Sequence, residues 1–350
     1  MAYTTVNDGS IYFNIILHTG TSSDALPLIG AGFQPDWVWS KGRSNSGDHF
    51  SHDSNRGVQK NLNQNDNGEE ATTSQGLQSF DSDGFTVGVL GGMNFLNQTY
   101  AHWLWKCNGG TTSSNTDGGV TGTTQANTAA GFSIMLYTGT GSTNTVGHGL
   151  GAKPDWIIYK RRDGGTRDWI VFHKGTGSRG MILNSSSVGD TAGSIFGGNT
   201  PTSTTIPIGS ATETNTSSQN HIAYAFAPIQ GYSKFGTYTG NANADGTFVY
   251  TGFKPRFLII KSFTTIASWN LYDTARSPFN DGKLDAFKVN ATDAETSSPN
   301  NEGGDNLDIL SNGFKLITAD NDFNGDNTYI YMAFAESPFV TSNKTPNNAR

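Results

Sequence analysis

The chain has 350 residues and a formal net charge of −7, and only 15% of its residues are charged. The lack of a basic cluster disfavours nucleic-acid binding, and no apolar stretch approaches the roughly 20 residues of a membrane-spanning helix. Cys107 is the only cysteine, so no intramolecular disulfide can form. The N-terminus shows neither the basic nor the apolar region of a secretory signal. We therefore expect a protein made in a reducing cytoplasm and not inserted into a membrane.

The composition predicts an all-β protein. Gly, Ser, Thr and Asn are abundant, and the aromatic residues are 21 Phe, 12 Tyr and 7 Trp. Aromatic side chains fill the thin cores between β-sheets, whereas Gly and Asn suit the turns between short strands. No stretch keeps the apolar spacing of a long helix. Many short strands packed as sandwiches therefore account best for the sequence.

Nearly the same segment occurs three times along the chain. It reads "GFQPDWVWSK" at 32–41, "GAKPDWIIYK" at 151–160 and "GFKPRFLIIK" at 252–261. In each copy the glycine of a "TG" pair precedes the proline by 15 residues, and a lysine follows the proline by six. Each copy closes on an aromatic strand, at 100–106, 221–227 and 329–335. These fixed spacings predict three homologous modules of about 100–110 residues each.

The segments between the copies predict the domain boundaries. Residues 108–131 lack aromatics, so we expect them to form a linker that runs along a surface without a core. The last residues resemble a mobile or partner-bound tail. The predicted division is a jelly-roll-like β-sandwich at 1–107, the linker at 108–131, a second sandwich at 132–228, a third at 229–339 and the tail at 340–350.

The strand after each proline is apolar on both faces, so we expect it to lie centrally between two covered surfaces. A proline at the first residue of a strand loses no ladder hydrogen bond. Matched positions on this strand and on the closing strand, both rich in aromatics, should be buried: Trp37, Trp156, Phe257, Trp103, Tyr224 and Met332. The positions assigned a structural role are Pro35, Trp37, Lys41, Pro154, Trp156, Lys160, Pro255, Phe257 and Lys261.

Charged residues of the repeat are also interpreted as structural. Each repeated lysine is expected to lay its stem on apolar surface and its ammonium group in water. Asp36 and Asp155 correspond to Arg256 in the third copy, so this position cannot be a shared acid or base. Two copies contain an aspartate three residues before an arginine, which should hold a turn by an ion pair. These pairs are Asp53 with Arg56 and Asp273 with Arg276, and the second copy offers only a displaced Arg179.

Two kinds of candidate ligand site remain. Trp39 and Trp169 lack aromatic counterparts at matching positions, so they are candidates for exposed platforms that stack on sugars. The segment "DNDFNGD" resembles the first half of a calcium loop, with Asp320, Asp322, Asn324 and Asp326 at alternating positions. The acid expected near position 331 is absent, since that residue is Tyr331. A turn rich in Asp and Asn is therefore favoured over a calcium site.

No catalytic constellation is visible. His18 matches Tyr137 and Tyr238 of the other copies, which indicates a packing position. The other histidines show no repeated metal spacing, and no serine lies in a nucleophile motif or pairs recognisably with a histidine. We therefore expect a protein that is not an enzyme and that carries no cofactor.

The whole chain resembles a triple-repeat structural protein of marine bacteriophages, such as those that infect cyanobacteria and pelagic α-proteobacteria. The resemblance rests on "GYSKFGTYTGNANADGTFVYTGFKP" at 231–255, "SNGFKL" at 311–316 and "YIYMAFAESPF" at 329–339. The opening "MAYTTVNDGSIYFN", the linker "GGTTSSNTDGG" and the tail "TPNNAR" fit it too. The resemblance implies a virion protein on the capsid or in a tail appendage, and it brings no catalytic residues.

Three functions follow in order of preference. The first is an exposed tail or capsid appendage that contributes to attachment to host-surface glycans, because tandem weak sites gain avidity. The second is a capsid decoration (cement) protein or tail adaptor without a ligand of its own, and the third is a glycan-degrading virion enzyme. We expect contacts with other virion proteins and a homo-oligomer, with a trimer as the first expectation. Its contacts should use polar loops and the linker at 108–131.

Overall fold

The computed structural model describes residues 4–189, 193–280, 284–296, 306–338, 340 and 343. These residues form an all-β fold, as the composition predicts, and every pair of neighbouring strands within the sheets is antiparallel. The only helices in this part of the chain are single turns: η1 (Gly9–Ile11), α1 (Gly91–Asn94), η2 (Lys174–Thr176) and α2 (Thr212–Asn215). Most of the tail at 340–350 falls outside the described residues.

The strands group into three modules, each with a large sheet and a small one. The large sheet of the first module contains, in spatial order, β1 (Phe13–Thr19), β9 (Thr99–Trp105), β3 (Trp37–Gly42), β4 (His49–Asp53), β5 (Lys60–Asn63) and β6 (Ala71–Thr72). Its small sheet contains β2 (Leu26–Ile29), β8 (Gly84–Val87) and β7 (Leu77–Asp81).

The second module follows the same plan. Its large sheet contains β10 (Ser113–Asn115), β11 (Gly122–Asn127), β12 (Phe132–Thr138), β18 (Asn220–Phe226), β14 (Trp156–Arg161), β15 (Ile170–His173) and β16 (Gly180–Ile182). Its small sheet contains β13 (Asn144–Gly147) and β17 (Thr205–Ile208).

The large sheet of the third module contains β19 (Ser233–Thr239), β26 (Thr328–Pro338), β21 (Phe253–Ser262), β22 (Asn270–Asp273) and β23 (Ala286–Lys288). Its small sheet contains β20 (Phe248–Tyr250), β25 (Gly313–Leu316) and β24 (Leu307–Leu310). In all three modules the closing strand pairs on one side with β1, β12 or β19, and on the other side with the strand that follows or contains the repeated proline. Descent of the modules from one ancestral unit stays a prediction.

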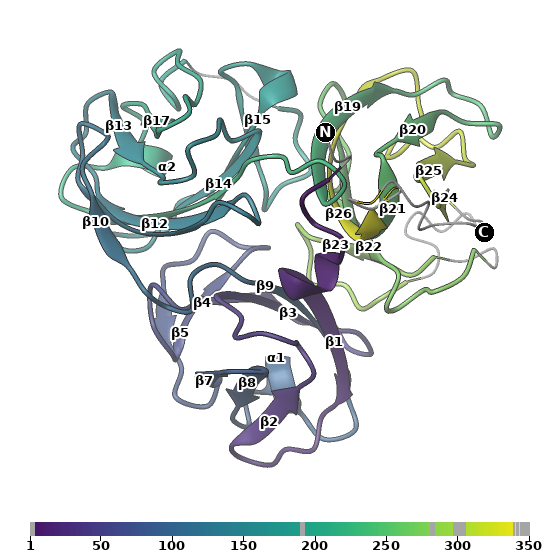
Figure 1. Ribbon diagram of the computed structural model, residues 1–350, viewed down its shortest axis with the longest axis horizontal. Helices are drawn as coiled ribbons and strands as arrows, with labels where there is room; N and C mark the ends of the chain where they lie inside the picture. The colour runs from purple at the N-terminus through teal and green to yellow at the C-terminus, as the bar shows by residue number, and fades with distance from the viewer. Residues whose placement is uncertain are drawn as a thin grey trace.

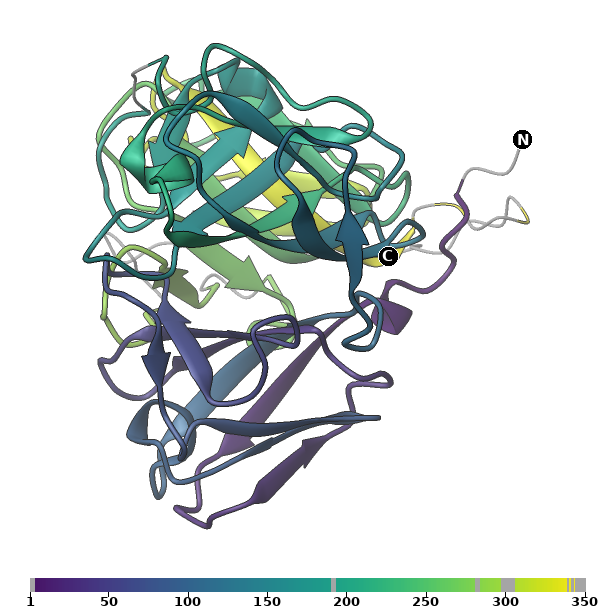
Figure 2. The ribbon, with the colours of Figure 1, turned by 90° about the vertical axis from the view of Figure 1, so that its left-hand side faces the viewer.

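The three large sheets surround one shared core. Figure 1 shows the modules around a common centre, with the second and third modules side by side, and Figure 2 shows the first module at one end of the molecule. Alternate residues of each central strand face this centre: Trp37 and Trp39 belong to the shared cluster, whereas Val38 between them packs under the small sheet. The Trp37 and Tyr224 rings of two modules lie 4.6 Å apart, and the Phe13 and Phe334 rings lie 5.4 Å apart.

Burial of the predicted core residues is confirmed. Their side chains belong to the shared core and are at most 1% exposed: Trp37, Trp156, Phe257, Trp103, Tyr224 and Met332. The opposite faces of the large sheets build three further clusters with the small sheets. Each central strand is therefore covered on both sides, as its two apolar faces predict.

The expectation of a coreless linker at 108–131 is wrong. Two of its segments are strands, because β10 pairs with β11 and β11 pairs with β12 at the edge of the second large sheet. Backbone pairing needs no apolar side chains, so a polar segment can extend a sheet. Gln125 is 1% exposed and donates from Nε2 to Ser54 Oγ of the first module at 2.7 Å. The segment therefore ties two modules together.

The prolines do not all precede their strands. Pro35 and Pro154 come just before β3 and β14, whereas Pro255 is the third residue of β21. The register of β21 against β26 shifts on both sides of Pro255, which marks an irregularity in the ladder. A proline is tolerated there because the irregular pairing does not require its missing N–H group.

Replacement of Trp156 by Ala should lower the free energy of unfolding by about 3–5 kcal/mol, because the cavity opens inside the shared core. Chemical denaturation monitored by circular dichroism measures this change. Phe279→Ala is the control, since that side chain is 64% exposed and its loss should change stability by less than about 0.5 kcal/mol. A loss below about 1 kcal/mol at Trp156 would contradict the shared core.

Candidate functional site

The repeated lysines lie at the contacts between modules. The side chains of Lys41, Lys160 and Lys261 are 0% exposed. Each Nζ donates at 3.2 Å to a main-chain carbonyl of a different module, on Thr292, Asn67 and Ser186 respectively. The expectation that these ammonium groups lie in water is therefore wrong. A loop of the neighbouring module covers each strand end, and nothing in the local sequence indicates that cover.

Each of these three carbonyls also accepts a second hydrogen bond from the module that carries the lysine. The donors are the main-chain N–H groups of Gly47, Arg167 and Ala267, at 2.8, 2.9 and 3.0 Å. The first module thus binds the third, the second binds the first, and the third binds the second. We refer to these three lysine–carbonyl contacts as the clamps, and together they close a ring within one chain.

Aromatic donors reinforce the clamps. Trp169 Nε1 donates to Asn63 O at 2.7 Å, and Trp269 Nε1 donates to Ile182 O at 2.9 Å. His49 takes the same place in the first module, where its Nε2 lies 3.2 Å from Lys288 O. Trp39 Nε1 donates to His49 Nδ1 at 3.0 Å, so Nδ1 is the acceptor and Nε2 carries the proton.

Trp39 and Trp169 are therefore not sugar platforms. They are 1% and 0% exposed, so no ligand can stack on their rings. Trp169 also has an aromatic counterpart after all, because Trp269 makes the same contact in the third module. Sequence comparison missed this match because one loop is a residue shorter than the other.

Two of the three contacts between modules are reinforced by carboxylates. Asp53 accepts from Arg56 Nε and, at 2.8 Å, from the hydroxyl of Tyr224 in the second module. Asp273 accepts from Arg276 Nε at 2.6 Å and from Trp103 Nε1 of the first module at 2.9 Å. The expected ion pairs are confirmed, and they also bind the neighbouring module.

A glutamate extends each of these networks. Glu70 lies between Arg56 and Arg162 of the second module, and Glu295 lies between Arg276 and Arg43 of the first. The contact between the third and second modules has a different composition. His173 and Thr176 occupy the positions of the aspartate and the arginine, and Met332 occupies the position of Trp103 and Tyr224. The second copy thus lacks the Asp–Arg pair at this contact, and the third module lacks the side-chain donor that would bind such an aspartate, because Met332 stands at that position.

Replacement of Arg56 by Met should lower the free energy of unfolding by about 3–5 kcal/mol, because it leaves buried Asp53 without its counter-ion. Arg179→Met is the matched control, since Arg179 is exposed and makes no ion pair with another described residue. The control should change stability by less than about 0.5 kcal/mol. Equal effects of the two substitutions, measured by urea denaturation, would contradict the assigned network.

Burial lowers the pKa of Lys41, Lys160 and Lys261 to about 8. Between about pH 8 and the ordinary lysine pKa of roughly 10.4, the unfolded chain therefore binds more protons than the folded protein. Stability from these groups must rise with pH across that interval, because folding no longer buries a charge.

Urea denaturation at pH 8 and pH 9.5 tests this sign. Removal of one lysine by Lys160→Met should flatten the rise by up to about 1 kcal/mol per pH unit relative to the unsubstituted protein. The comparison between the two proteins cancels other groups that titrate in the interval. An identical pH dependence of both proteins would show that Lys160 is not desolvated.

The interior of the first module contains a serine–histidine chain that sequence reasoning missed. Ser40 Oγ lies 2.7 Å from His102 Nδ1, and His102 Nε2 lies 2.9 Å from His18 Nδ1. Ser40 and His102 are 0% exposed, so Ser40 cannot reach a substrate as a nucleophile. His18 also stacks on Tyr100, as Tyr137 stacks on His221 in the second module. The hydrogen-bonded series Ser40–His102–His18 is therefore part of the packing of the first module and not a catalytic group.

Burial lowers the pKa of His18 to about 4 and that of His52 to about 3, and it holds the pKa of His102 well below its ordinary value. Below about pH 6.5 the unfolded chain thus takes up protons that the folded first module excludes. Stability must fall as the pH drops from 6.5 towards 4. Burial of these histidines therefore contributes to the loss of stability at acidic pH.

Replacement of His52 by Phe, the residue at the matching position 172, should reduce this acid loss. The variant removes one buried titrating group whose two ring nitrogens have no hydrogen-bond partner. Between pH 6.5 and 4.5 its stability should decrease less steeply, by about 1.4 kcal/mol per pH unit. Thermal melts across this interval measure the slope, and parallel slopes for both proteins would contradict the assignment.

The suggested calcium loop is a structural clasp. Asn324 is 0% exposed, accepts from Asn241 N at 3.2 Å, and donates to Asn243 O and Thr318 O at 2.7 Å. Its amide is thus fully used by the chain. Asn94 and Asn215 make equivalent bonds in the other modules. Among the residues that the structure describes, no group of three or more His, Cys, Asp or Glu is placed to hold a metal ion.

The clasp also explains the repeated "TG" pair. A Cβ on Gly20, Gly139 or Gly240 would lie within 2.2 Å of a carbonyl oxygen next to the clasp asparagine. Only glycine leaves room for this close approach of two backbones. The fixed spacing between this glycine and the proline therefore reflects packing, not chemistry.

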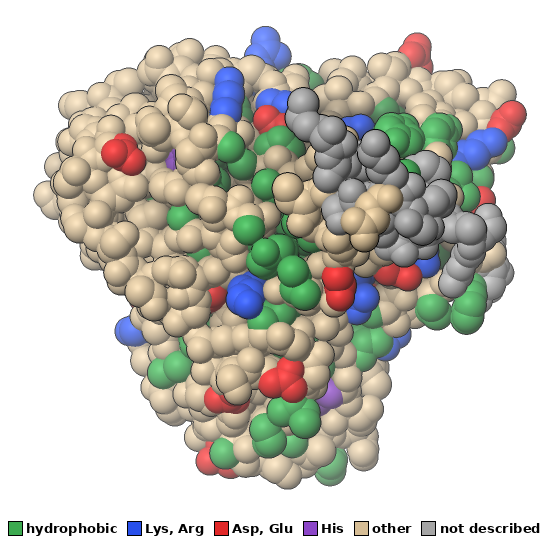
Figure 3. All heavy atoms as spheres, viewed as in Figure 1, with side chains coloured by type: hydrophobic (Ala, Val, Ile, Leu, Met, Phe, Trp, Pro, Cys, Tyr) green, Lys and Arg blue, Asp and Glu red, His purple; other side chains and the backbone are tan. Residues whose placement is uncertain are grey.

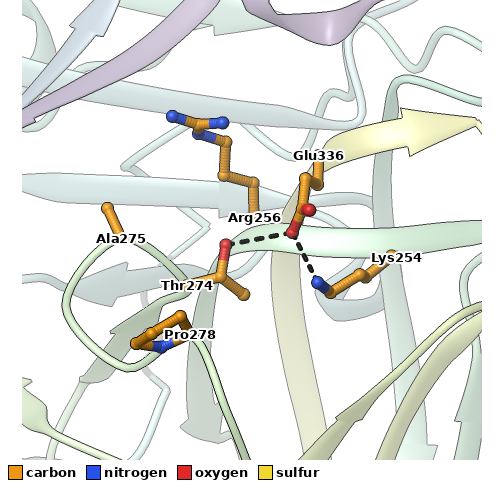
Figure 4. Close-up of a pocket in the computed structure, with 6 residues that line it drawn as sticks. All are labelled: Lys254, Arg256, Thr274, Ala275, Pro278 and Glu336. Atoms are coloured by element: carbon orange, nitrogen blue, oxygen red, sulfur yellow. Dashed lines mark hydrogen bonds and ion pairs between the residues drawn. The ribbon is translucent and has the colours of Figure 1, made fainter. Parts of the chain in front are cut away.

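The hollow in Figure 4 is open to solvent, is lined by residues of the third module and has a volume of about 150 Å³. Lys254 and Thr274 both contact Glu336, at 2.8 and 3.3 Å. The Arg256 guanidinium points away from this pair and donates to Asn14 Oδ1 of the first module at 2.8 Å. The Glu336 carboxylate that accepts from the Thr274 hydroxyl is already paired with the Lys254 ammonium group, so this contact is better explained as a surface ion-pair network than as a nucleophile with its base.

The residue after the repeated proline, Asp36, Asp155 or Arg256, makes a different contact in each module. In the first module, Asp36 accepts from the main-chain N–H groups of Cys107, Gly109 and Gly110. In the second, Asp155 forms an ion pair with Lys174 at 2.7 Å. Asp36 and Arg256 thus bind segments that are distant in the sequence, whereas Asp155 binds a neighbouring strand end. This agrees with the inference that the position is no shared acid or base.

The comparisons with known proteins define a family without an assigned activity. Residues 8–338 match the profile of a family described as a domain of unknown function (DUF7483), so the chain belongs to this family. No curated protein and no solved structure matches the chain. None of the helices in the described ranges is long and apolar enough to cross a membrane.

Proposed function

We propose that this protein is a non-catalytic structural protein of a bacteriophage particle, exposed on a tail or capsid appendage, which contributes to attachment to host-surface glycans. The bacteriophage assignment rests on the sequence resemblance. The observation that carries the proposal is that the polar groups most suited to chemistry hold the modules together. The repeated lysines and the Asp–Arg pairs are buried at contacts between modules, and Ser40 and His102 are buried inside the first module.

The outer surface supports a binding role. Figure 3 shows a face with few charged side chains and some hydrophobic ones near the centre, and most of it is backbone and side chains that are neither charged nor hydrophobic. Ser, Thr and Asn on such a surface make hydrogen-bonded contacts that include water. A rigid ring of sheets with loops and small sheets on its outside is a suitable scaffold for recognition.

A capsid decoration (cement) protein or tail adaptor is the second candidate. Large apolar side chains are exposed at separate places, with Ile29 and Ile266 both 70% exposed. Such side chains suit contacts with other particle proteins. The expected homo-oligomer, a trimer first, remains part of this proposal. Its contacts would have to use outer faces, because the inner faces of the modules are already paired within the chain.

A glycan-degrading enzyme is the third candidate and the weakest. One pair of neighbouring carboxylates is Asp48 and Asp66, which both accept from Asn63 Nδ2, at 3.1 and 3.0 Å. Asp48 also accepts from Asn65, and Asp66 accepts from the main chain of Gly68. Both carboxylates thus accept hydrogen bonds from nearby Asn side chains and a main-chain N–H group, as Asp residues in turns commonly do.

Gold-labelled antibodies against the purified chain test the proposal by electron microscopy of intact particles. We expect labels at a fixed position on the tail or capsid. Native mass measurement of the same preparation should give a multiple of 37.4 kDa. A monomer that is absent from the particles would contradict the structural role and favour an enzyme instead.

A further inference from the structure

The small sheet of the third module carries two aromatic side chains on its outer face. Phe248 and Tyr250 of β20 are 45% and 47% exposed, whereas Val249 between them is 6% exposed and faces the module core. Strand alternation therefore directs both aromatic rings to the same, outer side. Large aromatic side chains at an exposed sheet face need an explanation, because burial is their ordinary contribution to stability.

The fold itself does not require these rings. Tyr250, Ile29 and Gly147 are the last residues of the matching strands β20, β2 and β13. Two residues earlier, Phe248 corresponds to Pro27 and Thr145. The other modules thus build the same small sheet without aromatic residues on this face. The pair is a special feature of the third module.

The register gives the face a defined shape. Phe248 lies opposite Lys315, and Tyr250 lies opposite Gly313, which in turn pairs with Leu310 of β24. A Cβ on Gly313 would lie 2.1 Å from the Val249 carbonyl oxygen, so the backbone requires glycine. No side chain therefore stands between Tyr250 and Leu310. Gly313 therefore leaves a shallow depression on this face, with the Tyr250 side chain on one side and the Leu310 side chain on the other.

Polar groups surround the two rings. Lys315 forms an ion pair with Asp245 next to Phe248, and it lies opposite Asp308. On the other side, Lys234 Nζ donates to Tyr250 O at 2.7 Å and lies 5.3 Å from the centre of the Tyr250 ring. Ammonium groups that can donate and carboxylates that can accept hydrogen bonds thus lie at the edge of the two aromatic rings.

The size and chemistry of this face favour one kind of occupant. Two half-exposed aromatic side chains offer about 200 Å² in total, judged from 150–250 Å² for a whole aromatic side chain. A stable protein interface needs about 800 Å² on each partner. The net charge of −7 disfavours nucleic acid. A sugar ring, by contrast, has apolar C–H faces that cover an aromatic ring and hydroxyl groups that bond to charged side chains.

We propose that the outer face of β20, β25 and β24 is a glycan-binding site, with Phe248 and Tyr250 as the stacking platform. Lys315, Asp308 and Asp245 would bind the sugar hydroxyls. The ligand class is a neutral oligosaccharide, because cationic and anionic side chains are present together. This site rests on the proposed function, since it identifies where attachment to host-surface glycans would occur.

An array of immobilised neutral oligosaccharides tests the site with the full-length protein. We expect binding to at least one sugar, and at least a tenfold loss of affinity in the Phe248→Ala/Tyr250→Ala double variant. Tyr250→Trp should retain binding, because it keeps an aromatic face. Phe279→Ala is the control for general surface apolarity, since that ring is 64% exposed and lies outside this sheet. All variants should keep the unfolding midpoint of the unsubstituted protein.

Two results would overturn the site. Equal affinities of the double variant and the Phe279→Ala control would show that the platform is not used. Absence of binding to any neutral oligosaccharide by the unsubstituted protein would reject the ligand class. Neither result depends on the antibody labelling of particles, so failure of this site and failure of the particle assignment are separate outcomes.

Discussion

The structure depends on the burial of both faces of each large sheet. A small sheet covers one face, and the other faces Trp, Phe and Tyr side chains from the two remaining modules. A single module would expose that second face to water, which at about 25 cal/mol per Å² is a large unfavourable term. The three modules therefore need one another. The chain is better described as one ring of three sheets than as three independent sandwiches.

The clamps give this ring its geometry. Apolar packing alone is non-directional, so it does not determine how one sheet is placed against the next. A buried ammonium group such as that of Lys41 needs a carbonyl at hydrogen-bond distance, and its loss of hydration makes any other arrangement unfavourable. The carboxylate networks at two of the contacts act in the same direction. The third contact, between the third and second modules, relies on packing and its clamp.

The sequence predicts the fold better than it predicts the contacts between modules. Two-sided apolar strands such as "WIIY" indicate central strands with two covers, and the spacing of glycine, proline and lysine indicates recurring units. The environment of Lys160 could not be predicted, because its partner Asn67 lies 93 residues away. Trp169 looked like a surface residue for the same reason. The exposed pair at 248 and 250 has a sequence signal, since aromatics there replace Pro, Ile, Thr and Gly.

The central claim is that the three modules share one core and fold as one unit. Differential scanning calorimetry of the full chain tests it most directly, by comparing the calorimetric enthalpy of unfolding with the van't Hoff enthalpy. A single transition in which the two enthalpies agree is the predicted result. Two or three separable transitions, each with its own midpoint, would show that the modules are independently stable and would contradict the shared core.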